Sequence, residues 1–287
     1  MRSRYLPLLV CFALVGEERA VDPTFLKRSI SAVAAKTIDV STASCHYKPL
    51  FGAGDSEASV PKGIARFGEM IVDPGGVSQS VTYPREEQVY FIEDGSGGLQ
   101  YAGGTYPVRR NDFMYLAAGA SHGLANSGSA PLRAIVMGFK LPAGIKDEPP
   151  SKPPIANTDD VKKQLVGGHP ASTLYQLMIG DVTSTRDKIA AAHVLTSLFM
   201  MEIAPGGTNF PHHHEREEEI YLLLDGTGEM VAGGGMDGVE GRHPAKPGDA
   251  YFIRLNGTVG FYNSNAPGAP NAHILAARSL FPFAGKK

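Results

Sequence analysis

Short apolar segments alternate with polar stretches containing glycine, proline, asparagine or aspartate from residue 65 to near the C-terminus. Each apolar segment has the length of a β-strand, and turn-forming residues bound it, which is the pattern of an antiparallel sandwich or barrel. We therefore predict an all-β protein. The expected strands lie at residues 67–72, 89–92, 113–116, 134–139, 174–179, 195–203, 220–224, 250–255 and 273–277.

Two stretches break this pattern. Residues 21–64 show weak helical character around Phe25–Ala35 and then a loop-like composition, so we interpret them as an N-terminal extension. Residues 142–172 begin with a proline-rich polar run and are interpreted as a linker. These assignments leave two strand-rich domains, at residues 65–141 and 173–285.

The two strand-rich domains repeat each other. Gly76 matches Gly207 at an offset of 131 residues (207 − 76 = 131), and the residues around both keep this register. Downstream, Asp112 matches Asp249 at an offset of 137 (249 − 112 = 137), because the second domain has a longer glycine-rich loop. A repeat that holds its register over this distance indicates duplicated domains.

A histidine-rich stretch in the second domain has the spacing of a metal site. His212 and His214 are two residues apart, so their imidazoles share one face of a strand, and Glu219 on the next strand can converge with them. His213 should point away. Two imidazoles and a carboxylate leave coordination positions open for substrate, water or O2. The alternative interpretation is a solvated polar turn beside the charged run at residues 215–219.

The chain resembles a cupin at these residues. The first cupin motif is matched at every position by Gly206, His212, His214, Glu219 and Gly226. The second motif is matched by Pro247-Gly248-Asp249 and Asn263, but Val259 takes the place of its histidine. The resemblance spans both domains and implies a bicupin, that is, two tandem jelly-roll β-barrels with a metal-binding C-terminal barrel.

The first domain has lost most of these ligands. The repeat alignment places Val81, Tyr83 and Gln88 opposite His212, His214 and Glu219. Only His122 keeps its role in the cupin motif, at the position that Val259 holds in the second domain. We therefore expect a first barrel without metal. Tyr83, Gln88 and His122 could line a second, polar pocket; the alternative is a filled structural barrel.

The resemblance also implies a class of chemistry. It implies a divalent metal ion, with Mn or Fe first and Zn or Ni as alternatives, that polarises a small oxygen-rich substrate or activates O2 or water. A dioxygenase, a decarboxylase or oxidase, or an isomerase fits this site, and the sequence identifies no catalytic residue. A non-catalytic barrel that binds a sugar or another small molecule is the alternative. Ureidoglycine aminohydrolases are a further alternative, although their ligand pattern differs from the one found here.

The substrate pocket is expected beside the metal. Tyr221 shares strand parity with Glu219 and should face the barrel interior, and Val259 either opens a coordination position or weakens the site. Arg254 could reach a substrate carboxylate at the mouth, or could simply be an exposed arginine. His243 or His273 could supply a fourth donor only if the fold brings one of them close.

Composition restricts the partners. The formal net charge is −2, and no run rich in lysine and arginine is present, so nucleic acid is not an expected partner. Cys11 and Cys45 have no CxxC spacing, which leaves His, Asp, Glu or Gln as metal ligands. We expect a small-molecule substrate or ligand, and the resemblance implies a homodimer or higher homo-oligomer.

The N-terminus has features of a signal peptide. Arg2 and Arg4 precede an apolar segment at residues 5–15, which is long enough for a signal-peptide core but too short to span a membrane. Residues 1–20 therefore predict secretion or a periplasmic location. The alternative is an apolar N-terminal strand or tail of a cytoplasmic protein.

Overall fold

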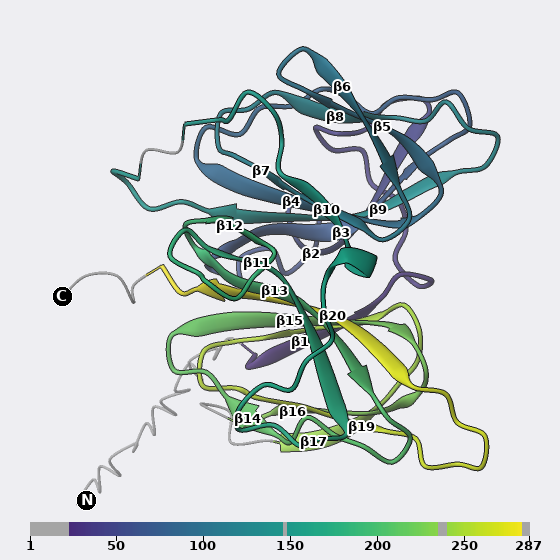
Figure 1. Ribbon diagram of the computed structural model, residues 1–287, viewed down its shortest axis with the longest axis vertical. Coiled ribbons are helices and arrows are strands. Elements are labelled where there is room, and N and C mark those ends of the chain that lie inside the picture. The colour runs from purple at the N-terminus through teal and green to yellow at the C-terminus, as the bar shows by residue number, and fades with distance from the viewer. Residues whose placement is uncertain (1–22, 146–147, 235–239, 283–287) are drawn as a thin grey trace, which may run out of the picture.

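The computed structural model describes residues 23–145, 148–234 and 240–282, which form two stacked β-barrels (Figure 1). Within these ranges there is no α-helix, and the single helical element is the short 3-10 helix η1 (Thr158–Asp160). These ranges accordingly contain no helix with the length and apolar character needed to span a membrane. The signal-like segment, residues 1–20, lies outside the described residues.

The first barrel is formed by a six-stranded sheet in the order β10-β7-β4-β9-β3-β2 and a three-stranded sheet in the order β6-β5-β8. Its strands are β2 (Cys45–Gly52), β3 (Ile64–Val72), β4 (Glu86–Asp94), β5 (Ser96–Tyr101), β6 (Gly104–Arg109), β7 (Asp112–Leu116), β8 (His122–Ala125), β9 (Leu132–Lys140) and β10 (Ile155–Asn157). The strands expected in the first domain are confirmed as parts of β3, β4, β7 and β9.

The second barrel is formed by a seven-stranded sheet in the order β1-β18-β15-β20-β13-β11-β12 and a four-stranded sheet in the order β14-β19-β16-β17. Its strands are β1 (Phe25–Ser29), β11 (Thr173–Asp181), β12 (Ile189–Ala192), β13 (Leu195–Ile203), β14 (His212–His213), β15 (Glu217–Asp225), β16 (Gly228–Gly233), β17 (Glu240–Ala245), β18 (Asp249–Ile253), β19 (Thr258–Asn263) and β20 (Ala272–Leu280). The strands expected in the second domain correspond to β11, β13, β15, β18 and β20.

In each barrel, one edge strand comes from the segment that precedes the other barrel in the sequence. β1 lies before the first barrel but pairs antiparallel with β18 of the second, whereas β10 lies before the second barrel but pairs antiparallel with β7 of the first. The helical character expected around Phe25–Ala35 is therefore wrong, because pairing at a sheet edge outweighed a weak local pattern. β2 lies inside the segment assigned to the extension, so we propose that the first cupin domain includes it.

Strand alternation sends the side chains of the large sheets into separate cores. On β15, Tyr221 and Leu223 face the interior of the second barrel, whereas Ile220 and Leu222 face the junction between the barrels. On β4, side chains likewise alternate between the interior of the first barrel and the junction. Position 219 therefore belongs to a barrel interior, and position 218 to the junction.

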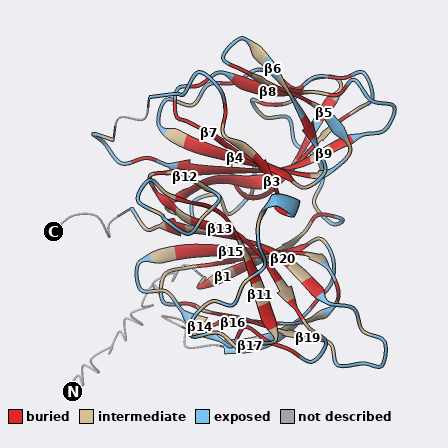
Figure 2. Cartoon of the chain, viewed as in Figure 1, coloured by how far each residue is buried: buried red, intermediate tan, exposed pale blue. Residues whose placement is uncertain are grey.

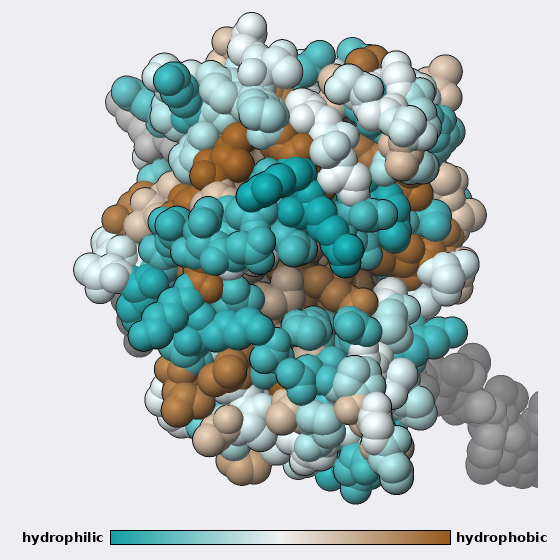
Figure 3. Space-filling view, turned by 45° about the vertical axis from the view of Figure 1, so that its right-hand side comes forward, coloured by the Kyte–Doolittle hydropathy of each residue, from teal (hydrophilic) through white to brown (hydrophobic). Residues whose placement is uncertain are grey.

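Aromatic residues from both barrels fill the junction. The ring centroids of Phe51 and Phe252 lie 6.0 Å apart across it, and both side chains are fully buried. Burial of one such side chain stabilises a fold by about 1.5–3 kcal/mol, so the shared core stabilises both barrels together. Buried residues follow the strands that face the junction (Figure 2). On the face shown in Figure 3, hydrophilic residues cover much of the level where the barrels meet, with apolar residues in smaller patches.

Two asparagines confirm the duplication at the level of individual hydrogen bonds. Asn126 Nδ2 donates to the carbonyl oxygens of Val72 at 2.9 Å and Ala130 at 2.8 Å. At the matching position, Asn263 Nδ2 donates to the carbonyl oxygens of Ile203 and Pro270, both at 2.9 Å. The same side chain thus closes the same turn in each barrel.

Candidate metal centre

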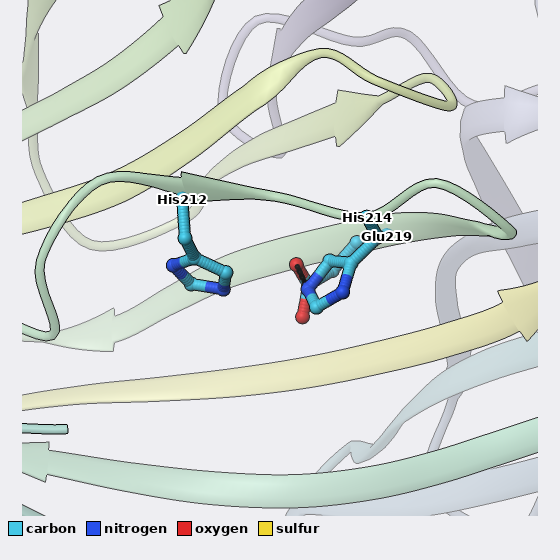
Figure 4. A group of neighbouring side chains, drawn as sticks. All are labelled: His212, His214 and Glu219. Atoms are coloured by element: carbon cyan, nitrogen blue, oxygen red, sulfur yellow. Dashed lines mark ion pairs between the residues drawn. The ribbon is translucent and has the colours of Figure 1, made fainter. Parts of the chain in front are cut away.

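His212, His214 and Glu219 converge on one point inside the second barrel. One ligand atom from each lies within 4.8 Å of the other two. The two imidazole centroids are 5.0 Å apart with perpendicular ring planes, and His214 Nε2 lies 3.2 Å from Glu219 Oε2. Figure 4 shows the histidines reaching from the short strand β14 and the turn after it toward Glu219 on β15. This is the convergence that the sequence predicted.

The local backbone explains why these histidines point inward. β14 pairs with β19, and His212 lies opposite Val259 in this pairing. Alternation along β14 then turns His213 outward, where it is exposed. The segment enters β14 through Phe210, whose φ of 57° is in the left-handed region, and His212 Nδ1 lies 2.8 Å from the Phe210 carbonyl oxygen.

That contact fixes the state of the His212 ring. A carbonyl oxygen only accepts, so Nδ1 carries the proton and Nε2 keeps its lone pair for a ligand. Burial lowers the pKa of His212, with smaller opposing contributions from the Phe210 carbonyl and Glu219, which favours the neutral imidazole that a metal requires.

Two buried polar atoms at the centre have no hydrogen-bond partner, His214 Nε2 and Glu219 Oε2. Buried polar atoms in folded proteins are almost always satisfied, and each unsatisfied one costs about 1–3 kcal/mol. An imidazole nitrogen and a carboxylate oxygen that face each other are both ligand atoms for a divalent cation. The donor set therefore fits a metal ion.

A cavity of ≈ 50 Å³ adjoins the three candidate ligands. Its other polar lining residues are His169, Tyr175, Arg186, Ser197 and Arg278. The Cα register places Ser197, Arg278 and Glu219 in one row across the adjacent strands β13, β20 and β15. The cavity thus has the candidate metal ligands on one side and hydroxyl and guanidinium groups beside them.

His169 also lines this cavity, although no motif in the sequence points to it. Its ring lies 5.5 Å from the His212 ring and 5.1 Å from the Tyr175 ring, measured between centroids. Its Nδ1 lies 3.1 Å from the carbonyl oxygen of Asn209. His169 is a single histidine within the segment assigned to the linker, and no spacing connects it to the metal motif.

The other residues expected in the pocket lie as follows. Tyr221 is buried on the cavity wall, and its hydroxyl accepts a hydrogen bond from Asn209 Nδ2 at 2.8 Å. Val259 is buried opposite His212, whereas Arg254 is not among the residues that line the cavity. The ring of His243 contacts that of Phe25 at a tilt of 43°, with centroids 4.9 Å apart, and His273 Nε2 lies 3.0 Å from Glu202 Oε2. Neither histidine lines the cavity.

In the first barrel, an arginine contacts the residues that stand in the ligand positions. Arg66 Nη1 donates to the Tyr83 hydroxyl at 2.7 Å and to Asp39 Oδ1 at 2.9 Å, and Nη2 lies 3.4 Å from Glu86 Oε2. Gln88 Nε2 donates to the same Glu86 oxygen at 2.8 Å. These contacts favour a filled barrel, in which a fixed guanidinium group lies among the former ligand positions.

A glycine makes room for this arginine. A Cβ at Gly138 would lie 2.8 Å from Arg66 Cγ and 2.5 Å from Gln88 Nε2. Arg66, Gly138 and Gln88 form the row that corresponds to Ser197, Arg278 and Glu219 in the second barrel. The arginine therefore lies on β3 in the first barrel and on β20 in the second.

His122 remains in the interior of the first barrel without its partners. Its Nδ1 donates to the Ala120 carbonyl oxygen at 2.9 Å, and its buried Nε2 has no hydrogen-bond partner. Burial lowers the pKa of this imidazole to about 4, so it is neutral at physiological pH.

The sequence matches the family model described as a cupin domain twice, over residues 68–138 and 199–266. No curated protein matches the chain significantly. Similar solved structures include a putative glyoxylate-induced protein from Pseudomonas aeruginosa, with a TM-score of 0.68, 14% identity and coverage of 94% of this chain and 95% of that one. Protein Ylba from E. coli has a TM-score of 0.66, 13% identity and coverages of 92% and 95%.

Bacillus subtilis oxalate decarboxylase, in a study of its Mn(II) centers, has a TM-score of 0.63, 12% identity and coverages of 90% of this chain and 78% of that one. At these identities the similarity establishes the arrangement of the two barrels, and the chemistry has to be argued from the site itself.

Proposed function

Since the chain is a bicupin of the cupin superfamily, we propose that its C-terminal barrel binds a divalent metal ion and acts there on a small oxygen-rich molecule. The observation that carries this proposal is the convergence of His212, His214 and Glu219, with two of their ligand atoms buried and unsatisfied. Mn or Fe is proposed first, because the oxalate decarboxylase with the same barrel arrangement has Mn(II) centers.

A metal held by three protein ligands supplies Lewis acidity and open coordination positions. The protein contributes two imidazoles, one carboxylate and a small cavity beside them. Glu217 supports the arrangement, because its Oε2 lies 3.5 Å from His214 Nδ1 and 3.7 Å from Arg278 Nη1. We propose a reaction of the dioxygenase, decarboxylase or oxidase, or isomerase type at this centre.

The cavity favours a substrate with a small polar group. Its volume of ≈ 50 Å³ is several times the roughly 10–15 Å³ that one water molecule needs, so a group of a few non-hydrogen atoms fits beside the metal ligands. The proposed substrate is therefore a molecule that places such a group in this cavity.

Metal analysis of matched variants tests the proposal. The purified wild-type protein should contain about one transition-metal ion per chain, and His212→Ala, His214→Ala and Glu219→Gln should each lose it while keeping the wild-type circular dichroism spectrum. His213→Ala is the matched control, because His213 lies between the two ligands but is exposed. A metal-free wild-type protein that does not take up Mn(II), Fe(II), Zn(II) or Ni(II) would rule the proposal out. The metal-loaded protein is then screened with small metabolites for O2 uptake or CO2 release.

A further inference from the structure

Three hydrogen-bonding groups on the wall of the cavity have buried atoms without a partner. They are the hydroxyl of Tyr175, the hydroxyl of Ser197 and Nε of Arg278. Tyr175 is 4% exposed and Ser197 1% exposed, so water from outside does not satisfy them readily. His214 Nε2 and Glu219 Oε2 are also buried without a hydrogen-bond partner, and their residues line the same cavity. We call Tyr175, Ser197 and Arg278 the donor wall.

The arginine of the donor wall is available for a ligand. Its ion-pair distances to Glu217 Oε2 (3.7 Å) and to Glu219 Oε1 (3.9 Å) are both longer than hydrogen bonds. Its guanidinium group lies 5.6 Å from the centre of the Phe199 ring, which supports it from one side. Arg66 in the first barrel is the opposite case, because the carboxylates of Asp39 and Glu86 already hold it.

The chemistry of the donor wall selects for an anion. A guanidinium group only donates hydrogen bonds and is always charged, and each hydroxyl group can donate one more. Counting a divalent ion as +2, Arg278 as +1 and the carboxylates of Glu217 and Glu219 as −1 each leaves a surplus of +1 at the site. Arg186 at the cavity adds further positive charge, although it is exposed. A ligand with one negative charge would neutralise this surplus of +1.

We propose that the donor wall binds the carboxylate group of a small organic acid, so that the substrate is a monocarboxylate. This inference rests on the proposed metal centre, which would contact the other end of the same molecule. Tyr175, Ser197 and Arg278 lie outside the cupin motifs and thus determine specificity rather than metal binding. The carboxylate accepts from all three groups, which satisfies the atoms that are otherwise unpartnered.

Binding measurements on the Mn(II)-loaded protein test this inference. The probes are acetate and lactate, and their neutral analogues acetamide and lactamide, titrated by calorimetry with metal content measured in parallel. We expect the acids to bind at least about 10-fold more tightly than the amides, because hydrogen bonds to a charged group are worth about 1.5–3 kcal/mol.

The variants separate the donor wall from direct binding of the acid to the metal. Ser197→Ala and Tyr175→Phe should each weaken acetate binding about 10-fold and Arg278→Met about 100-fold, with the metal content unchanged in the first two. Tyr47→Phe is the matched control, because Tyr47 is the repeat equivalent of Tyr175 and its buried hydroxyl also has no partner, but it lies in the first barrel. It should leave acetate binding unchanged.

The two proposals fail in different ways. If wild-type protein binds metal but acetate affinity is the same in Ser197→Ala and Tyr175→Phe as in wild type, the donor wall is wrong and the metal centre stands. If acids and amides bind equally well, the inference about charge is also wrong. If the protein binds no metal, the proposed function fails, whatever the calorimetry shows for acetate.

Discussion

Glu87 and Glu218 make the same contact across the junction in opposite directions. The carboxylate of Glu87, on the first barrel, accepts hydrogen bonds from the backbone amides of His193 at 2.7 Å, Val194 at 3.0 Å and Leu195 at 2.6 Å. Glu218, on the second barrel, accepts from the amides of Lys62 at 2.9 Å and Gly63 at 2.7 Å. His193 and Lys62 are repeat equivalents (193 − 62 = 131), so the same contact occurs once from each half of the repeat.

Replacing either glutamate should destabilise the whole chain. Glu87→Gln replaces one oxygen, which accepts hydrogen bonds in either protonation state of the carboxyl group, by an amide nitrogen that only donates, so a buried backbone donor is left unsatisfied. We expect the free energy of unfolding to fall by about 1–3 kcal/mol. Urea unfolding followed by circular dichroism measures this, and Glu215→Gln, at an exposed acid, should show no comparable change.

The same carboxylates should make stability depend on pH. Burial raises the pKa of Glu87 and Glu218 above the ordinary value of 4.5, despite the opposing effect of the backbone amides. The native state then binds these protons more readily than the unfolded chain does. Their contribution to stability is therefore fully present below pH 4.5 and is lost as pH rises through the raised native pKa.

Urea unfolding of wild type and of Glu87→Gln at a series of pH values tests this sign. The stability advantage of wild type over the variant should shrink as pH rises above 4.5. An advantage that is constant, or that grows with pH, would contradict the assignment.

Asn209 should fix the segment that carries His212. Its Oδ1 accepts from the amide of Phe261 on β19, the strand that pairs with β14, at 2.8 Å, and its Nδ2 donates to Tyr221 on the cavity wall. Asn209→Ala should reduce metal affinity about 10-fold, the lower end of the effect of losing a supporting hydrogen bond around a metal site. Calorimetric titration with Mn(II) measures this change.

Ser78→Ala provides the matched control for that variant. Ser78 is the repeat equivalent of Asn209 (209 − 78 = 131), and its Oγ accepts from the Leu124 amide at 2.9 Å. Each substitution leaves one buried backbone amide without its hydrogen-bond acceptor, so each should destabilise the fold by about 1–3 kcal/mol. Only Asn209→Ala should weaken metal binding; equal metal affinities would show that Asn209 has a structural role alone.

His169→Ala should keep the metal. His169 lines the cavity but does not belong to the group of ligand atoms that lie within 4.8 Å of one another. We expect wild-type metal content in His169→Ala by elemental analysis, in contrast to His212→Ala. Loss of the metal from His169→Ala would instead identify His169 as a fourth ligand.

A metal site should be recoverable in the first barrel. Val81→His, Tyr83→His and Gln88→Glu restore the ligand types, and His122 already offers an unsatisfied Nε2. Arg66 must be removed as well, because its positive charge lies among these positions. The four-fold variant with Arg66→Ser should bind about two metal ions per chain, whereas the triple variant that retains Arg66 should bind one, by elemental analysis.

The central strands of the two large sheets, the duplication and the gathering of His212, His214 and Glu219 were predictable from the sequence, whereas the strands of the two small sheets were not predicted. Strand alternation fixes which residues share a face, and the repeat fixes the register between the two halves. Arg66 was predictable in principle too, because the offset of 131 aligns it with Ser197 and so places a charged residue at a barrel-interior position.

The donor wall and His169 were not predictable in the same way. Ser197, Arg278 and Glu219 become neighbours only through the pairing of β13, β20 and β15, and this register depends on tertiary packing. The pairings of β1 and β10 are equally non-local. Short segments such as these carry too few residues for a local pattern to decide between strand and loop.

The exchange of edge strands has a consequence for how this chain can be divided. A break within residues 142–154 would give an N-terminal fragment carrying β1 and a C-terminal fragment carrying β10, each holding the strand that completes the other's sheet. Such fragments should find each other and reassemble, since each leaves an unpaired sheet edge when alone. Recombination at the same place would separate every barrel from one of its own strands. A half produced without the other would therefore lack one edge strand of its barrel.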